Sequence, residues 1–255
     1  MLKTRVIPVL LLHNKGLVKT VRFQKPKYIG DPINAIKIFN EKEVDELIFL
    51  DIDASKENRE PNFQLIEDFA SECFMPVCYG GGISNIKQIK KIFTLGIEKV
   101  SLNISVLENE NLIKEAVDIF GSQSIVVTID IKKSLFGKYQ IYNHSSQKTL
   151  KLSYLEYIKR LEHLGIGEIV INNVDLDGTQ KGYDIELLRT IVDNVKIPVI
   201  SCGGAGKLDD FKIVKDTANV SAVAAGSFFV FQGKHNAVLI TYPKYHELEK
   251  LFGEK

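Results

Sequence analysis

Carboxylates follow several apolar runs of the chain, and one of them is placed for proton transfer. Asp130 closes the run SIVVTID (124–130), where a side chain stands between a buried strand and a polar loop. A carboxyl group held partly out of water at such a place can act as a general acid or base. The competing interpretation is that Asp130 caps the following segment or pairs with Lys132. The position favours catalysis over capping.

The matching place in the first apolar run carries no carboxylate. When the first strand of each half of the chain is aligned, Leu11 of RVIPVLLL (5–12) falls on Asp130. Asp175 and Asp177 lie in a later loop, from which they could bond the hydroxyls of a ribose or glycerol unit. Asp51 is a weaker candidate, because it could simply be the structural partner of a nearby lysine.

Glycine clusters follow three of the apolar runs and are suited to binding anions. They are GGGIS (80–84), CGGAGK (202–207) and AAGSFF (224–229). Glycine lets the backbone approach a ligand closely, and a helix that begins next adds its positive end. The alternative is that these glycines only form tight turns, but two equivalent copies favour phosphate. The predicted ligands are Gly204, Gly226 and Ser227 at one phosphate, and Gly82 and Asn103 at a second.

The elements that must position these residues alternate along the chain. Each predicted strand is a continuous apolar run, typical of a parallel sheet covered on both faces. Eight such strands alternating with amphipathic helices predict a (β/α)8 TIM barrel. A doubly wound sheet would want a GxGxxG turn near its first strand, and there is none. The strands are predicted at 5–12, 46–52, 76–80, 99–103, 124–130, 168–174, 198–202 and 220–226, and helices include 62–74, 85–96 and 110–121.

An internal repeat supports the barrel. ELIFLDID (46–53) aligns with EIVINNVD (168–175), and MPVCYGGG (75–82) aligns with IPVISCGG (197–204). We therefore expect one barrel domain over 1–255, built from half-barrels at about 1–122 and 123–255. A barrel repeated in this way suggests two matched anion sites and a substrate that spans its mouth.

Four charged residues each start a predicted strand, at the opposite end of the barrel. Because strand starts cluster at the bottom, two bases and two acids there could form a salt-bridged ring. The residues alone favour exposed ion pairs that contribute little stability. The four are Arg5, Glu46, Lys99 and Glu168.

Composition excludes several classes of protein. The chain has 255 residues, 45% hydrophobic and 25% charged, with 33 Lys and Arg against 32 acids. This balance gives no electrostatic reason to expect nucleic acid or a membrane surface as a partner. The three cysteines lack CxxC spacing and the five histidines lack ligand spacing, so we expect no metal and no cofactor. With a first apolar run that reads as a strand, we expect a cytoplasmic protein.

Taken together, these motifs resemble a known family. IPVLLL, GLVKTVRF, YGGGI, KVSLN, DLDGTQKGYD and PVISCGGAGK are similar to the cyclase subunit of imidazole glycerol phosphate synthase. The resemblance implies a (β/α)8 barrel that docks a glutaminase subunit at its bottom and takes up ammonia through its core. At the top, ammonia meets a substrate with two phosphates. The products are imidazole glycerol phosphate, for histidine, and an aminoimidazole carboxamide ribotide, for purines.

The resemblance also implies roles for individual residues. The ring of charges becomes an ammonia gate, and Gln123 lies near the glutaminase interface. Lys19 matches a mobile loop that closes over substrate, and Asp130 matches one of two catalytic aspartates. Substrate or phosphate binding is implied for Lys19, Asp51, Gly82, Asn103, Asp177, Gly178, Gly204, Gly226 and Ser227.

The resemblance fails at the active face. Leu11 replaces the other catalytic aspartate, Asn172 and Asn173 replace small hydroxyl residues, and HSSQKT (144–149) replaces a glycine-rich turn. The chain is most similar to a branch found with surface-polysaccharide genes, which implies ammonia supply for an acetamidino sugar, here or in a third, sugar-modifying protein. The alternatives are an active cyclase in which Asp130 works alone, and a barrel without chemistry that activates a glutaminase.

Overall fold

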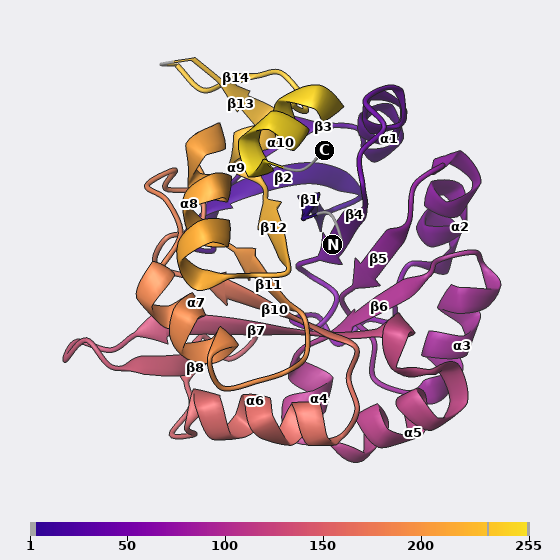
Figure 1. Ribbon diagram of the computed structural model, residues 1–255. Coiled ribbons are helices and arrows are strands. Elements are labelled where there is room, and N and C mark those ends of the chain that lie inside the picture. Colours follow the sequence, from indigo (N-terminus) through magenta and orange to yellow (C-terminus); the bar gives the residue numbers. More distant parts are fainter. Residues whose placement is uncertain (1–3, 234, 254–255) are drawn as a thin grey trace.

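The computed structural model describes residues 4–233 and 235–253, and within them eight parallel strands close into a barrel (Figure 1). Each strand pairs with the next, and the last pairs in parallel with the first, through Arg5 with Ala222 to Pro8 with Ala225. The predicted (β/α)8 barrel is confirmed. In order, the strands are β1 (Arg5–His13), β4 (Leu47–Asp51), β5 (Val77–Gly80), β6 (Lys99–Leu102), β7 (Ile125–Lys133), β10 (Glu168–Asn173), β11 (Val199–Cys202) and β12 (Ala222–Ala225).

Helices surround the barrel, and the three predicted by range are confirmed as α2, α3 and α5, each shorter by a residue or two at its ends. Side-chain caps fix two of these starts: Asn62 accepts from the N–H of Leu65, and Asn85 from that of Gln88. The helices are α1 (Pro32–Glu41), α2 (Phe63–Glu72), α3 (Ile86–Thr94), α4 (Ile104–Glu108), α5 (Asn111–Phe120), α6 (Tyr154–His163), α7 (Ile185–Val192), α8 (Leu208–Ala218), α9 (Ser227–Val230) and α10 (Tyr245–Phe252).

Strand alternation divides the apolar residues into two cores. Outward-facing side chains such as Phe49 pack under the helices, where its ring stacks on Phe69 at 4.4 Å. Inward-facing side chains form a separate buried cluster inside the barrel. Along β1, Ile7 and Val9 belong to this inner cluster, while Val6 and Leu10 belong to the outer one.

The two halves repeat the same backbone hydrogen bonds. The N–H of Leu47 donates to the carbonyl of Pro76, and the aligned N–H of Ile169 donates to that of Pro198, at 2.9 and 3.0 Å. At the ends of the strands, the side chain of Asp51 accepts from the N–H three residues later in the chain, and the side chain of the aligned Asn173 does the same. These pairs support the repeat seen in the sequence. The division at residues 122 and 123 stays a prediction, and residues 1–3, 234 and 254–255 of the expected domain lie outside the described part.

The sequence predicts that the first and fifth barrel strands, β1 and β7, end in polar loops. This prediction is wrong. Both continue beyond the barrel as antiparallel hairpins, so that Asp130 stands within β7 and not at its end. Asn14 and Lys15 adopt positive φ, as a tight hairpin turn requires. The added strands are β2 (Gly16–Val21) and β3 (Gln24–Gly30) after β1, β8 (Tyr139–Asn143) and β9 (Lys148–Thr149) after β7, and the short pair β13 (Phe231–Gln232) and β14 (Ala237–Val238).

In the described part of the chain, none of the helices has the length and apolar character that a membrane span requires.

Candidate active site

A pocket lies at the carboxyl ends of the barrel strands, and we call it the mouth pocket. This is the end at which the sequence predicts the active face. With the exception of Asp175, the structure brings together there the residues predicted to bind substrate or to transfer protons. They are Lys19, Asp51, Gly82, Asn103, Asp130, Asp177, Gly178, Gly204, Gly226 and Ser227. Their individual roles stay predictions.

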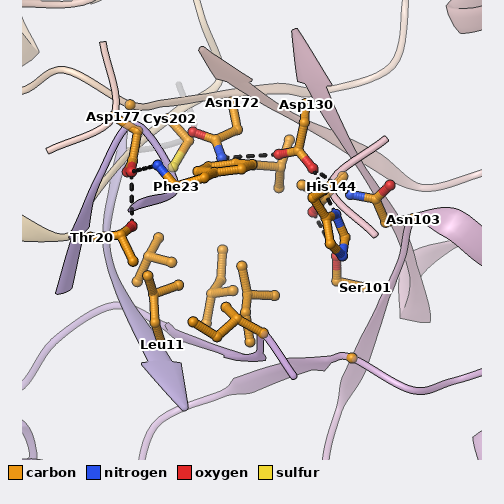
Figure 2. A pocket seen from close by; sticks show the side chains of 18 of the residues that line it. Leu11, Thr20, Phe23, Ser101, Asn103, Asp130, His144, Asn172, Asp177 and Cys202 are labelled. Atoms are coloured by element: carbon orange, nitrogen blue, oxygen red, sulfur yellow. Dashed lines mark hydrogen bonds and ion pairs between the residues drawn. The ribbon is translucent and has the colours of Figure 1, made fainter. Parts of the chain in front are cut away.

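Asp130 is the most enclosed carboxylate of the mouth pocket, with 4% of its surface exposed. Asn103 donates to one of its oxygens at 2.9 Å, and Asn172 donates to the other at 3.0 Å (Figure 2). His144 lies beside it, with Nδ1 3.3 Å from the oxygen that Asn103 contacts. Such donors compensate a buried carboxylate for lost water. Lys132, its partner in the competing interpretation, instead places its ammonium over the ring of Tyr142.

The opposite wall of the mouth pocket is apolar. Leu11 pairs along the sheet with Leu50, and both line the pocket together with Val9 and Ile48. Figure 2 shows Leu11 among apolar side chains, across the pocket from Asp130 and Asn172. A leucine cannot take up or release a proton, so this part of the wall offers no proton-transfer group opposite Asp130.

Sequence reasoning missed His144. It follows β8, and the β7–β8 hairpin folds it back onto Asp130, as the pairing of Ile131 with Ile141 requires. Spacing among the histidines held no signal for this contact. Recognition of the hairpin would have been enough to place residues near 144 above the end of β7.

Asn172 has a buried polar atom without a hydrogen-bond partner in the described part of the chain. Its amide nitrogen bonds to Asp130, while its buried Oδ1 has no hydrogen-bond partner among the described residues. A buried polar atom left unpaired costs about 1–3 kcal/mol. Among the described residues, Asn172 is the one residue lining the mouth pocket that has such an atom.

Lys19 and Asp177 bring two opposite charges to the pocket from different elements. Lys19 lies in β2, in place of the loop that the resemblance implied, and its ammonium donates to the carbonyl of Val9. Burial lowers the pKa of Lys19 to about 8, although Asp177 opposes this shift. Burial raises the pKa of Asp177, against the effect of bonds from Thr20 at 3.0 Å and the N–H of Phe23 at 3.3 Å. Asp177 thus holds the β2–β3 hairpin over the pocket (Figure 2).

Packing and backbone conformation require two glycines of the mouth pocket, Gly81 and Gly204. A Cβ at Gly81 would lie 2.3 Å from the carbonyl oxygen of Asp51, and one at Gly204 would lie 2.1 Å from that of Gly182. Both glycines have positive φ. Close packing and positive φ are enough to explain Gly81 and Gly204. The two phosphate sites stay predictions.

The remaining loop carboxylates make structural contacts. Asp51 accepts from the N–H groups of Asp53 and Ala54 at 3.0 Å, and its charged partner is Arg59 at 3.6 Å, not a lysine. Asp175, expected to bond substrate hydroxyls, accepts from the N–H of Lys133 at 2.8 Å. It is absent from the described lining of the mouth pocket.

At the other end of the barrel, Arg5, Glu46, Lys99 and Glu168 meet in one ring, which we call the floor ring. Arg5 bonds to Glu46 at 2.5 Å and to Glu168 at 2.8 Å, and Lys99 bonds to the same two carboxylates at 3.0 and 3.2 Å. Burial by itself would lower the pKa of Arg5. The charges and hydrogen bonds of Glu168 and Glu46 outweigh this effect, so the pKa of Arg5 is raised. Glu46 is only 2% exposed, so exposed ion pairs are the wrong description.

Gln123 is exposed at the same end of the barrel. It lies in the short 3₁₀ turn Ser122–Ser124, just before β7, and its amide donates to the carbonyl of Phe120 at 3.3 Å. Its predicted place at an interface is compatible with this exposure and stays a prediction.

The barrel interior lies between the floor ring and the mouth pocket. Ser101 and Thr128 bring their hydroxyls within 2.6 Å of each other there, and both also line the pocket. The rest of the interior is apolar, built from Ile7, Val9, Ile48, Cys78, Val126, Val170, Ile200, Ala222 and Ala224. Small neutral molecules suit such a lining better than ions do.

The closed parallel barrel defines a (β/α)8 protein with a pocket at the carboxyl ends of the strands. Residues 5–236 match the family described as "Histidine biosynthesis protein", and the chain belongs to this family.

Relatives cover nearly the whole chain. "Putative imidazole glycerol phosphate synthase subunit hisF2" of Pseudomonas aeruginosa is 55% identical over 98% of this chain and 99% of the relative. The similarly named subunit hisF3 of Vibrio vulnificus, also termed putative, is 50% identical over 98% and 96%. "Imidazole glycerol phosphate synthase subunit HisF" of Petrotoga mobilis is 40% identical over 89% and 91%. The chain is thus HisF-like in sequence over nearly its whole length.

Proposed function

We propose that this chain receives ammonia from a glutaminase partner through the barrel and uses it on an acceptor at the mouth pocket. The acceptor is phosphorylated or nucleotide-linked, and its chemistry has diverged from histidine synthesis towards acetamidino-sugar, surface-polysaccharide synthesis. The observation that carries this proposal is the contrast along β1. Arg5 at its start belongs to a complete floor ring, whereas Leu11 near its end replaces a proton-transfer group.

Ammonia intake is supported by the floor ring and the interior above it. The ring balances two positive against two negative charges, so it presents no net charge to a neutral molecule. Above the ring, the apolar interior favours neutral ammonia over the ammonium ion. The glutaminase would dock at this end, beside the exposed Gln123.

Altered acceptor chemistry is supported by the mouth pocket. Its polar wall keeps Asp130, but its other wall offers the apolar side chains of Leu11 and Leu50. An amidine forms when nitrogen is delivered to an activated acetamido carbon, and this reaction does not need the paired acid and base of the cyclase. The carbon could be attacked in this pocket or in a third, sugar-modifying protein that takes over the ammonia.

The kept residues of the polar wall favour one second candidate, an active cyclase that makes imidazole glycerol phosphate and the carboxamide ribotide. Asn103, Asp130 and Asp177 all line the pocket as the resemblance implies. Loss of one partner of an acid–base pair lowers rates by about 10²- to 10⁴-fold, so such a cyclase would be slow.

The test follows isotopic nitrogen. The purified protein is mixed with ¹⁵N-ammonium and the ribulosyl substrate of the family, or with a nucleotide-linked acetamido sugar and its activating enzyme. We expect label in an amidine and none in imidazole glycerol phosphate. Rapid formation of labelled imidazole glycerol phosphate would overturn the proposal in favour of the cyclase. Stimulation of a glutaminase with no labelled product beyond ammonia would favour a non-catalytic activator.

A further inference from the structure

We propose that His144 and Asp130 act as one proton-transfer pair in the mouth pocket, with Nε2 of His144 as the atom that exchanges protons with the reacting groups. This inference rests on the proposed function, because it names the group that takes up the proton that ammonia loses after bonding to carbon.

The contact with Asp130 fixes which nitrogen of His144 is available. An ionised carboxylate only accepts hydrogen bonds, so Nδ1 of His144, 3.3 Å from Oδ2 of Asp130, must carry its proton towards it. The neutral ring then keeps a lone pair on Nε2. A separation of 3.3 Å is long, as catalytic hydrogen bonds often are before a substrate binds.

The surroundings of Asp130 hold the pair in place. Asn103 and Asn172 donate to different oxygens of the carboxylate, so the group cannot turn freely. The side chain of His144 is 20% exposed and lines the pocket. Figure 2 shows its ring on the same wall as Asn103 and Ser101. Among the described residues, Nε2 of His144 has no hydrogen-bond partner.

A second histidine–carboxylate pair shows what a structural version looks like. Nδ1 of His13 lies 2.8 Å from Asp53, and Nε2 of His13 contacts the amide of Asn14 at 3.1 Å. Both ring nitrogens of His13 are thus occupied, and neither His13 nor Asp53 lines the mouth pocket. His144 differs, because its Nδ1 is engaged while its Nε2 has no partner among the residues that the structure describes.

The proposed step balances without a further reactant. The lone pair of ammonia forms a C–N bond to an electrophilic carbon that bears an oxygen leaving group. The adduct nitrogen gives one proton to Nε2, and Asp130 stabilises the imidazolium that forms. Nε2 then returns this proton to the oxygen as the C–O bond breaks. The products are the aminated carbon and the protonated leaving group, and His144 regains its starting form.

The first experiment needs no acceptor. Protein with ¹⁵N-labelled histidine is studied by long-range ¹H–¹⁵N NMR, and His144 and His13 are assigned from His144→Gln and His13→Gln. We expect the neutral ring of His144 to carry its proton on Nδ1, and Asp130→Ala to abolish this preference. A proton on Nε2, or a tautomer that ignores Asp130→Ala, would overturn the pair.

The second experiment measures turnover with ammonium and whichever acceptor the wild type accepts. His144→Gln should lower kcat by about 10²- to 10⁴-fold with little change in KM. His13→Gln is the matched control and should leave kcat unchanged, with thermal unfolding recorded for both variants. Equal rates for His144→Gln and wild type would refute a catalytic role. A wild type that turns over no acceptor would count against the proposed function only, and the tautomer would still decide on the pair.

Discussion

The floor ring and the mouth pocket both bury ionisable groups, but they stabilise them in different ways. At the floor, each carboxylate contacts both cations, so the four charges compensate one another. At the mouth, Asp130 depends on two amides and an imidazole, and Lys19 on a backbone carbonyl. A buried charge without a full set of partners is costly. The floor ring therefore compensates its own charges, whereas at the mouth we propose that a ligand supplies the partners that Lys19 and Asn172 lack among the described residues.

This difference explains how one end of the barrel can change while the other is kept. Arg5, Ile7, Val9 and Leu11 alternate along β1 on the inner face, so the floor and the mouth are separated by layers of apolar side chains. Substitutions at distant sites without shared partners act almost independently. A leucine at position 11 can therefore alter the acceptor chemistry without disturbing the floor ring.

The largest effect is expected from Leu11→Asp, which would make the mouth resemble the family pattern again. If Leu11 is the main lesion, the variant should turn over the ribulosyl substrate of the family with ammonium about 10²- to 10⁴-fold faster than the wild type. Stopped assays for the carboxamide ribotide measure this gain.

Leu11→Asn is the matched control, because it adds polarity of the same shape without a group that ionises. A gain shared by both variants would point to hydration of the apolar wall instead of proton transfer. No gain in either would show that the mouth has diverged beyond this residue, as Asn172 and His144 suggest. That outcome would strengthen the contrast between a diverged mouth pocket and a kept floor ring.

An intermediate effect is expected from Lys99→Met at the floor. The variant leaves Glu46 and Glu168 with Arg5 as their only cation in the ring, which should cost roughly 1–3 kcal/mol of unfolding free energy. Transfer from glutamine should fall more than transfer from free ammonium, because only the former requires passage through the floor. The ratio of the two rates is the measurement.

Lys90→Met, which removes an exposed ammonium from α3, controls for the general loss of a positive charge. If Lys99→Met reduced both nitrogen sources equally, the floor ring would be a structural device, and the functional contrast between floor and mouth would fail.

The sequence predicts the barrel well because its signals are local. Continuous apolar runs mark each strand. The charged residues at strand starts favour exposed ion pairs when taken alone, and only the family resemblance favours a ring. The contact between His144 and Asp130 was out of reach, because it depends on a hairpin whose strands are partly exposed and weakly patterned. The placement of Lys19 in β2 was missed for a related reason, since the β2–β3 turn uses Arg22 and Phe23 at positive φ, without glycine.

The smallest effect concerns Lys19, whose pKa is lowered by burial from 10.5 to about 8. Below pH 8, Lys19 is protonated in both folded and unfolded chains, and the folded state carries the full cost of the buried cation. Between pH 8 and 10.5, only the folded state has given up the proton, so the wild type gains stability as the pH rises. Lys19→Met should therefore be more stable than the wild type below pH 8, by an amount that shrinks towards pH 10.5.

Urea unfolding of the wild type and Lys19→Met across this range tests the comparison directly. Lys27→Met is the control, because Lys27 is exposed on β3 directly opposite Lys19. A stability difference that stays constant from below pH 8 to pH 10.5 would mean that Lys19 is as well compensated as the charges of the floor ring. The mouth would then need no ligand to balance its charges, and the distinction between the two ends of the barrel would rest on Leu11 alone.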